Sequence, residues 1–188
     1  MNASTSDDYV IRAIRADEWM AAKRLRLDAL RDPVAHIAFM TTYEEAEAMP
    51  DSFFQERALA SGEGAPGARQ FIAEAPDGTW VGSATVLLEK PGAEDWAGYP
   101  VDRLQGQVVG VFVRPEHRGR GLTEALLGAG AAWAWEQEAE RVRLFVHENN
   151  TRAQAAYRKA GFVPSGVAVK FAKFEAEMDL EFVLERRS

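Results

Sequence analysis

The hydrophobic pattern of the chain changes its period abruptly near residue 115, and this change restricts the possible folds more than any other feature. Residues 107–114 are dense in valine and predict a strand, which Pro115 ends. From Arg118 to about Glu138 apolar residues recur at helical spacing, and residues 142–147 again predict a strand. This succession of strand, glycine-containing bend, helix and strand predicts a layered α/β domain built on a central sheet.

Turn and capping signals in the sequence predict the remaining helices and strands. An Asp-Gly pair between two apolar runs predicts a β-hairpin, and two sequence signatures of capping boxes predict short helices. The expected segments are a strand at 9–14, a helix at 17–31, helical pieces within 42–61 with capping boxes at Thr42–Glu45 and Ser52–Gln55, hairpin strands at 70–75 and 79–89, a surface loop at 90–104, a helix at 151–160 ended by Gly161, and strands at 167–171 and 178–184. Together they predict a mixed sheet with α/β (α+β) character.

The length and the residue types limit the chemistry. A chain of 188 residues with 47% hydrophobic residues suits one globular domain, which we place at residues 9–188 after a polar tail at residues 1–8. The absence of cysteine excludes disulfides, a thiol nucleophile, thiolate metal sites and iron–sulfur clusters. The three histidines show no ligand spacing, so we expect no metal.

Charge and hydropathy restrict the partners. A formal net charge of -7 disfavours nucleic acid, because such a surface repels phosphates. The longest apolar run, Ala125–Trp135, is too short to cross a membrane. The polar, acidic start of the chain lacks the pattern of a secretory signal, so we expect a cytoplasmic protein with no membrane partner.

The bend after Pro115 is a candidate anion site. A helix that starts after a strand and a glycine-containing loop presents free backbone N–H groups. Gly119 and Gly121 allow a phosphate to approach this backbone. Positive charge comes from Arg114, Arg118 and Arg120. A diphosphate is the ligand that this arrangement favours. The alternative is a plain strand-to-helix turn whose arginines only solvate the surface.

A second segment follows the strand at 142–147. Asn150 precedes a helix that carries Tyr157, and the seven-residue spacing places both on a similar face. A phenolic O–H can donate a proton during catalysis. The alternative is that Tyr157 is a half-buried packing residue with a hydrated tip.

Taken together, the two segments resemble the signature of the GNAT superfamily of acyl-CoA-dependent N-acetyltransferases. The first resembles its Arg/Gln-x-x-Gly-x-Gly/Ala loop, here from Arg118 through Gly121 to Thr123, where threonine replaces a smaller residue. The second resembles an Asn-x-x-Ala-x-x-x-Tyr-x-Lys-x-Gly-Phe segment, matched in this chain by Asn150, Ala153, Tyr157, Lys159, Gly161 and Phe162. The resemblance implies a splayed sheet of about six to seven strands with helices on both faces.

The family also implies roles for individual residues. Acetyl-CoA would be the cosubstrate, held at its pantetheine arm by the backbone of Val111, Phe112 and Val113. Asn150 would contact it near the thioester, and Tyr157 would protonate the leaving thiolate. Its pyrophosphate would lie on the loop formed by Arg118, Gly119, Arg120, Gly121, Leu122 and Thr123. The splay would separate the strands at 107–114 and 142–147.

Direct attack by an amine requires that the amine be neutral, so a base is needed. Some relatives that acetylate protein N-termini carry a glutamate at the position of Phe145. His147 lies on the same strand face and is the candidate base, with Glu148 next; the alternative is that His147 only packs at a strand end. Phe145 thus disfavours a protein N-terminus as the acceptor.

The resemblance implies an acceptor pocket formed by the early helices and the last strands. The aromatic and acidic residues there suit a cationic, partly apolar amine, although each could equally be core or solvated surface. They are Trp19, Phe39, Tyr43, Glu44, Glu45, Glu47, Phe53 and Phe54. The sequence therefore predicts an N-acetyltransferase acting on a small-molecule amine. Two alternatives stay open, a protein acetyltransferase with a peptide amine as acceptor and a non-catalytic acyl-CoA sensor. The strand at 178–184 could pair with a second copy and form a homodimer.

Overall fold

In the computed structural model, which describes residues 8–171 and 176–187, the strands form one mixed sheet. The strands are β1 (Val10–Ala13), β2 (Ala68–Glu74), β3 (Trp80–Glu89), β4 (Gln105–Val113), β5 (Arg141–His147), β6 (Val163–Lys170) and β7 (Met178–Glu185). The helices are η1 (Ala16–Glu18), α1 (Trp19–Ala29), α2 (Ala35–Ala38), α3 (Tyr43–Glu47), α4 (Asp51–Ser61), η2 (Pro115–His117), α5 (Leu122–Glu136) and α6 (Thr151–Lys159), where η marks a 3-10 turn.

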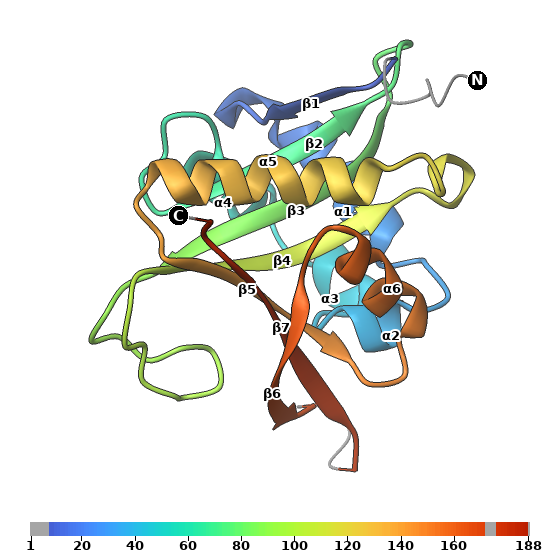
Figure 1. Cartoon of the computed structure of the whole chain (residues 1–188). Coiled ribbons are helices and arrows are strands. Elements are labelled where there is room, and N and C mark those ends of the chain that lie inside the picture. Colours follow the sequence, from blue (N-terminus) through green and yellow to red (C-terminus); the bar gives the residue numbers. More distant parts are fainter. Residues whose placement is uncertain (1–7, 172–175, 188) are drawn as a thin grey trace, which may run out of the picture.

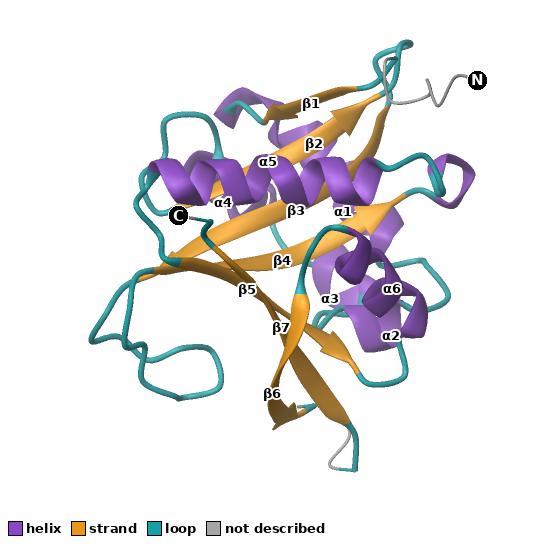
Figure 2. Cartoon of the chain, viewed as in Figure 1, coloured by secondary structure: helices purple, strands orange, loops and turns teal. Residues whose placement is uncertain are grey.

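Helices cover both faces of the sheet, whose strand order is β1-β2-β3-β4-β5-β7-β6. The long α5 crosses the front face in Figure 1, with α6 beside its start, while α1 and α4 lie behind the strands. Only β4 and β5 run parallel among the described strand pairs; the others are antiparallel, as the arrows in Figure 2 show. The predicted mixed sheet with helices on both faces is confirmed.

Each face of the sheet has its own apolar core. Leu126, Leu127 and Ala134 of α5 are buried against strand residues such as Val86 and Val142. On the other face, residues of α1 and α4 bury a second cluster, which includes Leu25, Ala58, Ile72 and Phe112. Burial on both faces explains why the central strands read as continuous apolar runs.

The sheet splays between β4 and β5. Their ladder ends at the pair Val108–Leu144, although β4 continues to Val113 and β5 to His147. Figure 1 shows the two strands diverging beyond this point. The splay predicted between the strands at 107–114 and 142–147 is therefore present, and it opens the centre of the molecule.

A bulge in β4 lies at the same place. The register with β3 shifts between Ser83 and Thr85, where β4 contains one extra residue, and Gly110 has a φ of 64°. A residue with a side chain rarely adopts this backbone conformation. Because of the bulge, Val108 and Val113 both reach the α5 face, which strict alternation over five residues would forbid.

Three details of the prediction are wrong. The helix expected from Arg118 begins at Leu122, because the chain first makes the turn η2 and then adopts positive φ at two glycines. The capping box expected at Ser52–Gln55 is absent: the N-cap of α4 is Pro50, two residues before Ser52, and no side chain caps the helix. The four-residue helix α2 was not predicted. In contrast, the capping box at Thr42–Glu45 is confirmed, with both of its hydrogen bonds formed.

The last strand is not an edge. β7 pairs with β5 on one side and with β6 on the other, so the expectation that residues 178–184 pair with a second copy is wrong. The edges of the described sheet are β1 and β6.

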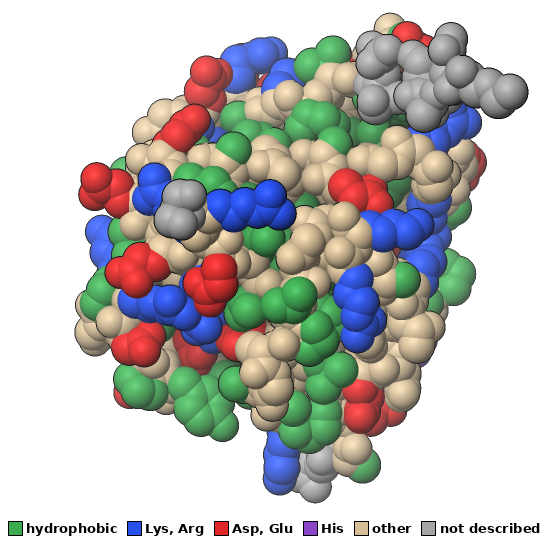
Figure 3. Space-filling model, in the orientation of Figure 1, with side chains coloured by type: hydrophobic (Ala, Val, Ile, Leu, Met, Phe, Trp, Pro, Cys, Tyr) green, Lys and Arg blue, Asp and Glu red, His purple; other side chains and the backbone are tan. Residues whose placement is uncertain are grey.

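The surface over α5 carries mixed charge. Acidic and basic side chains alternate over the face in Figure 3 without forming one large acidic patch. Of the tail expected at residues 1–8, residues 1–7 lie outside the described part of the chain, and Asp8 is exposed. Among the described residues, no helix combines the length and the apolar character that a bilayer crossing needs.

Candidate active site

The splay opens into a cleft of about 1200 Å³ that joins the segments singled out by the sequence. Its walls come from α1, α4, β3, β4, β5, β7, the start of α5 and one face of α6. Of the residues predicted to bind the cosubstrate and the catalytic candidates Tyr157 and His147, Arg120 alone does not line the cleft. Those that do are Val111, Phe112, Val113, Arg118, Gly119, Gly121, Leu122, Thr123, His147, Asn150 and Tyr157.

The far half of β4 presents backbone groups to the cleft. Beyond Val108, β4 no longer pairs with β5, and Val109, Gly110 and Val111 line the cleft. Backbone N–H and C=O groups need partners when they are shielded from water. An extended ligand that lies along β4 would supply them, in the manner of an added strand. An N–H near the bulge could also polarise a carbonyl oxygen.

The start of α5 is built for an anion. Gly119 and Gly121 have φ values of 73° and 74°, and Gly121 is the N-cap residue without a side-chain cap. The first N–H groups of the helix are therefore not occupied by a capping side chain, and the helix dipole favours negative charge there. This geometry agrees with the predicted diphosphate site.

The arginines of this region divide into two groups. Arg118 donates from Nε to the carbonyl of Val113 (2.9 Å) and from Nη2 to Asp32, which ties the bend to the segment after α1. Arg114 likewise donates to Asp28 of α1 (2.8 Å). These two side chains hold the loop in place, so positive charge that faces a ligand has to come from elsewhere.

The helix α6 supplies that charge. Arg152 and Lys159 of α6 line the cleft, and Arg120 is exposed beside the bend. Asn150 caps α6, since its Oδ1 accepts from the N–H of Ala153 at 3.3 Å. The cap fixes the side-chain oxygen of Asn150 and leaves its amide N–H groups for a ligand.

Tyr157 of α6 faces the cleft from a buried position. The side chain is 8% exposed and lines the cleft. Burial raises the pKa of Tyr157 to about 12, while the positive charge of Arg152 acts in the opposite direction. The phenol is therefore protonated at every physiological pH, as a proton donor must be at the start of a reaction.

His147 is buried with both ring nitrogens engaged. Nε2 lies 2.7 Å from a carboxylate oxygen of Glu177, and Nδ1 accepts from the N–H of Asn149 at 3.1 Å. Because Nδ1 accepts a hydrogen bond, Nε2 carries the proton, and the Nε2–H group donates a hydrogen bond to Glu177. Phe171 contacts the ring edge-on. Glu148, the second candidate base, accepts from the N–H of Met178 and does not line the cleft.

Asp179 is a site residue that the sequence reading missed. It faces His147 across the β5–β7 ladder, lines the cleft and is 8% exposed. Burial raises the pKa of Asp179, and the neighbouring His147 opposes the rise. In the sequence, Asp179 is a polar residue in a strand where polar and apolar residues alternate, as is typical of a solvent-facing position. In the structure, this position faces the cleft instead.

We expect Asp179→Asn to stabilise the protein near neutral pH. When folding raises the pKa of a carboxyl, the protein becomes less stable as the pH rises through the folded pKa, because the buried group then becomes charged. The neutral amide of asparagine avoids this loss of stability. The melting temperature of the variant should exceed that of the wild type at pH 7, and the difference should shrink as the pH approaches about 4. Thermal melts over this range, with the exposed Asp102→Asn as control, measure the effect. A difference that does not depend on pH would contradict the assignment.

The predicted acceptor residues are only partly brought together. Phe39, Glu45, Phe53 and Phe54 line the cleft, whereas Trp19, Tyr43, Glu44 and Glu47 do not. Glu45 is occupied, because its side chain accepts from the N–H of Thr42 in the capping box. The described residues contain no group of three or more potential metal ligands.

Comparison with known proteins identifies the family. Residues 21–162 match the model of the Acetyltransferase (GNAT) family. The chain belongs to this family. Among solved structures, a GCN5-related N-acetyltransferase from Kribbella flavida covers 97% of this GNAT chain with a TM-score of 0.69 at 19% identity, and the alignment includes 100% of that chain. The paia N-acetyltransferase from Thermoplasma acidophilum, determined in complex with coenzyme A, covers 92% of the chain and 97% of its own length with a TM-score of 0.66 at 14% identity.

Curated relatives share part of the sequence. A mycothiol acetyltransferase from Clavibacter sepedonicus is 35% identical over 97 residues, which are 50% of this chain and 32% of that protein. An aminoglycoside N(6')-acetyltransferase type 1 from Stenotrophomonas maltophilia is 32% identical over 115 residues, or 61% of this chain and 70% of that protein. The chain thus spans about a third of the mycothiol acetyltransferases that it matches. These names cover different acceptors, so the acceptor has to be argued from the cleft itself.

Proposed function

We propose that this GNAT protein transfers the acetyl group of acetyl-CoA to a primary amine of a small molecule by direct attack. One observation carries the proposal: the uncapped start of α5, the β5-facing side of β4 beyond Val108 and the hydroxyl-bearing side chain of Tyr157 all line one cleft. The start of α5 suits a diphosphate, the backbone of β4 suits an extended arm that contains amides, and Tyr157 suits the sulfur of a thioester. Acetyl-CoA contains all three groups and supplies the activated acetyl group.

The residues divide the reaction between them. N–H groups of α5 and the loop before it bind the pyrophosphate, with Arg152 and Lys159 nearby. The β4 backbone at residues 109–111 pairs with the pantetheine amides and polarises the acetyl oxygen. The amine nitrogen then forms a bond to the carbonyl carbon as the carbon–sulfur bond breaks. Tyr157 donates first a hydrogen bond and then its proton to the departing sulfur, and Arg152 favours this loss of the proton.

The proton of the amine needs a separate acceptor. His147, the predicted base, would have to give up one of its two present hydrogen bonds to accept it. Asp179 lies beside His147. Because burial raises the pKa of Asp179, its carboxylate is a stronger base than that of an ordinary aspartate. We therefore propose that the two residues act together, with Asp179 accepting the proton and His147 fixing its surroundings.

Binding of acetyl-CoA should stabilise the protein by mass action. At a ligand concentration of a hundred times Kd we expect the melting temperature to rise by about 5–10 °C. Gly121→Glu should abolish the rise, because the side chain meets a positive φ and its charge repels the diphosphate. Circular dichroism would establish that this variant is folded. A wild-type protein without any shift at millimolar acetyl-CoA would refute the cosubstrate site.

Turnover can be followed by the release of free CoA thiol with a panel of amines. The chain contains no cysteine, so the thiol reagent reacts with no group of the protein. Release that depends on both acetyl-CoA and an amine would support the proposal. If the protein binds acetyl-CoA tightly but releases no CoA thiol with any small amine or peptide, a non-catalytic acyl-CoA sensor is favoured instead.

A further inference from the structure

Two arginines, Arg26 and Arg57, line the cleft on the side of α1 and α4. Arg26 of α1 places its guanidinium 4.6 Å from the ring centre of Phe39, and Arg57 of α4 lies 5.4 Å from that of Phe53. The two helices pack against each other, and both arginines and both rings line the cleft. A pair of cations is thus held on aromatic supports beside the space left for the acceptor.

Neither guanidinium forms an ion pair within the described part of the chain. The cations around them are paired: Lys23 contacts Asp51 at 2.7 Å, and Arg31 contacts Asp28 at 3.8 Å. No hydrogen bond found among the described residues is donated by the side chain of Arg26 or Arg57. In a protein whose net charge is -7, carboxylates are abundant, so the lack of a partner is notable.

The carboxylates that line the cleft are engaged or placed elsewhere. Asp32 pairs with Arg118, and Glu45 accepts from the N–H of Thr42. Glu124 lies in the first turn of α5, and Asp179 lies on β7 opposite His147. None of the four forms an ion pair with Arg26 or Arg57. The basic wall of the cleft is therefore open to an anion from outside the chain.

The two charges also act on each other. Burial and, to a smaller extent, the positive charge of Arg57 together lower the pKa of Arg26 to about 10. Arg26 remains charged at pH 7, so the protein maintains a half-buried cation without a partner next to a second cation. Such an arrangement costs stability, and an oxyanion bound between the two guanidinium groups would remove the cost.

We propose that the acceptor amine carries an oxyanion group, a carboxylate or a phosphate, which Arg26 and Arg57 bind. This inference rests on the proposed acetyl transfer and names the class of acceptor. The amine of such a molecule faces the Asp179 and His147 side of the same cleft, while its oxyanion faces α1 and α4. It replaces the expectation of a purely cationic acceptor, since the carboxylates expected to bind that cation at Glu44 and Glu47 lie outside the cleft.

Inorganic anions test the subsite without turnover. With the CoA site saturated by CoA, sodium phosphate or sodium acetate at constant ionic strength should raise the melting temperature of the wild type more than sodium chloride does. Arg26→Gln and the double variant Arg26→Gln/Arg57→Gln should lose this rise. Arg24→Gln, an exposed arginine on the same helix that does not line the cleft, should retain it. Equal shifts in all variants would overturn the inference, and the phosphate and acetate arms tell which oxyanion is preferred.

Matched amines test the role in transfer. Each pair differs only in the oxyanion: an amino acid and its carboxamide, or an amino sugar phosphate and the free amino sugar. We expect the anionic member to have a kcat/KM that is higher by roughly tenfold to a hundredfold. Arg26→Gln should remove this preference by raising the KM of the anionic member, whereas Arg24→Gln, outside the cleft, should retain the preference. A preference for the neutral member, or one that Arg26→Gln leaves intact, would overturn the inference.

The proposed acetyl transfer and the oxyanion subsite are refuted by different results. If acetyl-CoA neither shifts the melting temperature nor releases thiol with any amine, the proposed transfer is refuted. If thiol is released equally with both members of every pair, transfer stands and the oxyanion subsite is refuted.

Discussion

Tyr157→Phe is expected to lower kcat by roughly a hundredfold to ten-thousandfold, the range that general acid catalysis usually contributes. The substitution removes one oxygen from a buried side chain and leaves its ring in the core beneath α5. The dissociation constant of acetyl-CoA should change little, because the loop before α5 and the β4 backbone are untouched. Stopped assays of thiol release, together with a binding titration, separate the two quantities.

Tyr99→Phe is the matched control. Tyr99 lies on the surface loop with a side chain 58% exposed, outside the cleft. Its loss of a hydroxyl should leave kcat unchanged. If Tyr157→Phe turned over at the wild-type rate, the proton to the sulfur would have to come from water, and the role given to Tyr157 would be wrong.

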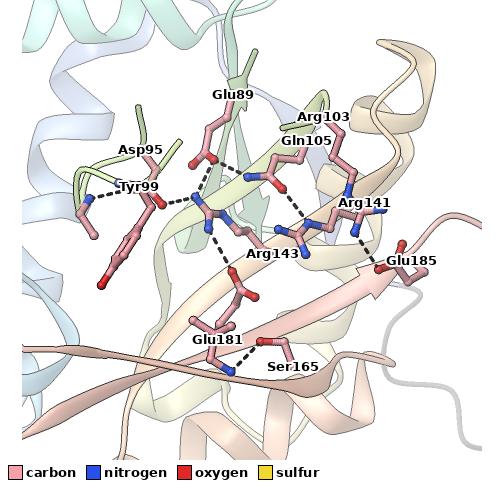
Figure 4. Close-up of polar contacts among 12 residues, drawn as sticks. Glu89, Asp95, Tyr99, Arg103, Gln105, Arg141, Arg143, Ser165, Glu181 and Glu185 are labelled. Atoms are coloured by element: carbon pink, nitrogen blue, oxygen red, sulfur yellow. Dashed lines mark hydrogen bonds and ion pairs between the residues drawn. The ribbon is translucent and has the colours of Figure 1, made fainter. Parts of the chain in front are cut away.

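Arg143→Met is expected to destabilise the fold by about 3–5 kcal/mol, the cost of leaving buried charges without their partner. Arg143 contacts Glu89 at 2.7 Å, Asp95 at 2.9 Å and Glu181 at 3.0 Å, and all four side chains are largely buried. Figure 4 shows the guanidinium pointing between carboxylates that come from β3, the following loop and β7. For a chain of this length the loss corresponds to a fall in melting temperature of roughly 6–20 °C.

The effect should depend on pH. Burial alone would raise the pKa of Asp95, but the N–H of Tyr99 and the guanidinium of Arg143 hold it below its usual range. A carboxyl with a lowered pKa contributes stability above its unfolded pKa and loses it as the pH falls. The difference between wild type and Arg143→Met should therefore be largest at neutral pH and shrink below about pH 4.

A neighbouring arginine provides the control. Arg141 also lies on β5, but its Nε donates to the neutral oxygen of Gln105. Arg141→Met should cost about 1 kcal/mol, as the loss of a typical hydrogen bond does. Equal losses at both positions would show that the carboxylate cluster does not need its cation.

The cluster also positions part of the cleft. Asp95 accepts from the N–H groups of Ala97 and Tyr99 and so shapes the loop at 90–104. Trp96 in this loop lines the cleft and contacts Phe145 edge-on, with ring centres 5.2 Å apart. At temperatures where Arg143→Met is still folded, we expect its defect to appear in the KM of the acceptor.

The sequence predicted the features whose signals are local. The period change at residue 115, the Asp-Gly hairpin and the two motif segments placed the sheet, α5, α6 and a set of residues that line the cleft. The start of α5 was misplaced by four residues because nothing in the pattern reveals that Gly119 and Gly121 take positive φ and delay the helix.

Features that depend on distant contacts could not be predicted in this way. Arg143 meets carboxylates that lie 38, 48 and 54 residues away in the chain. Asp179 occupies a strand position whose alternation is typical of a solvent-facing residue. Arg26 and Arg57 belong to helices whose packing alone brings them together. In each case the tertiary fold, and no local pattern, gives the residue its surroundings.

The position of β7 between β5 and β6 affects the order of assembly during translation. The ribosome releases β6 before the strand that must separate it from β5, so β6 has no neighbour in the sheet until residues 178–185 emerge. Until then β5 exposes a row of unpaired amides. Asp179 itself arrives with that last strand, so a nascent chain that already holds the whole loop before α5, the proposed diphosphate site, cannot yet hold the proposed proton acceptor.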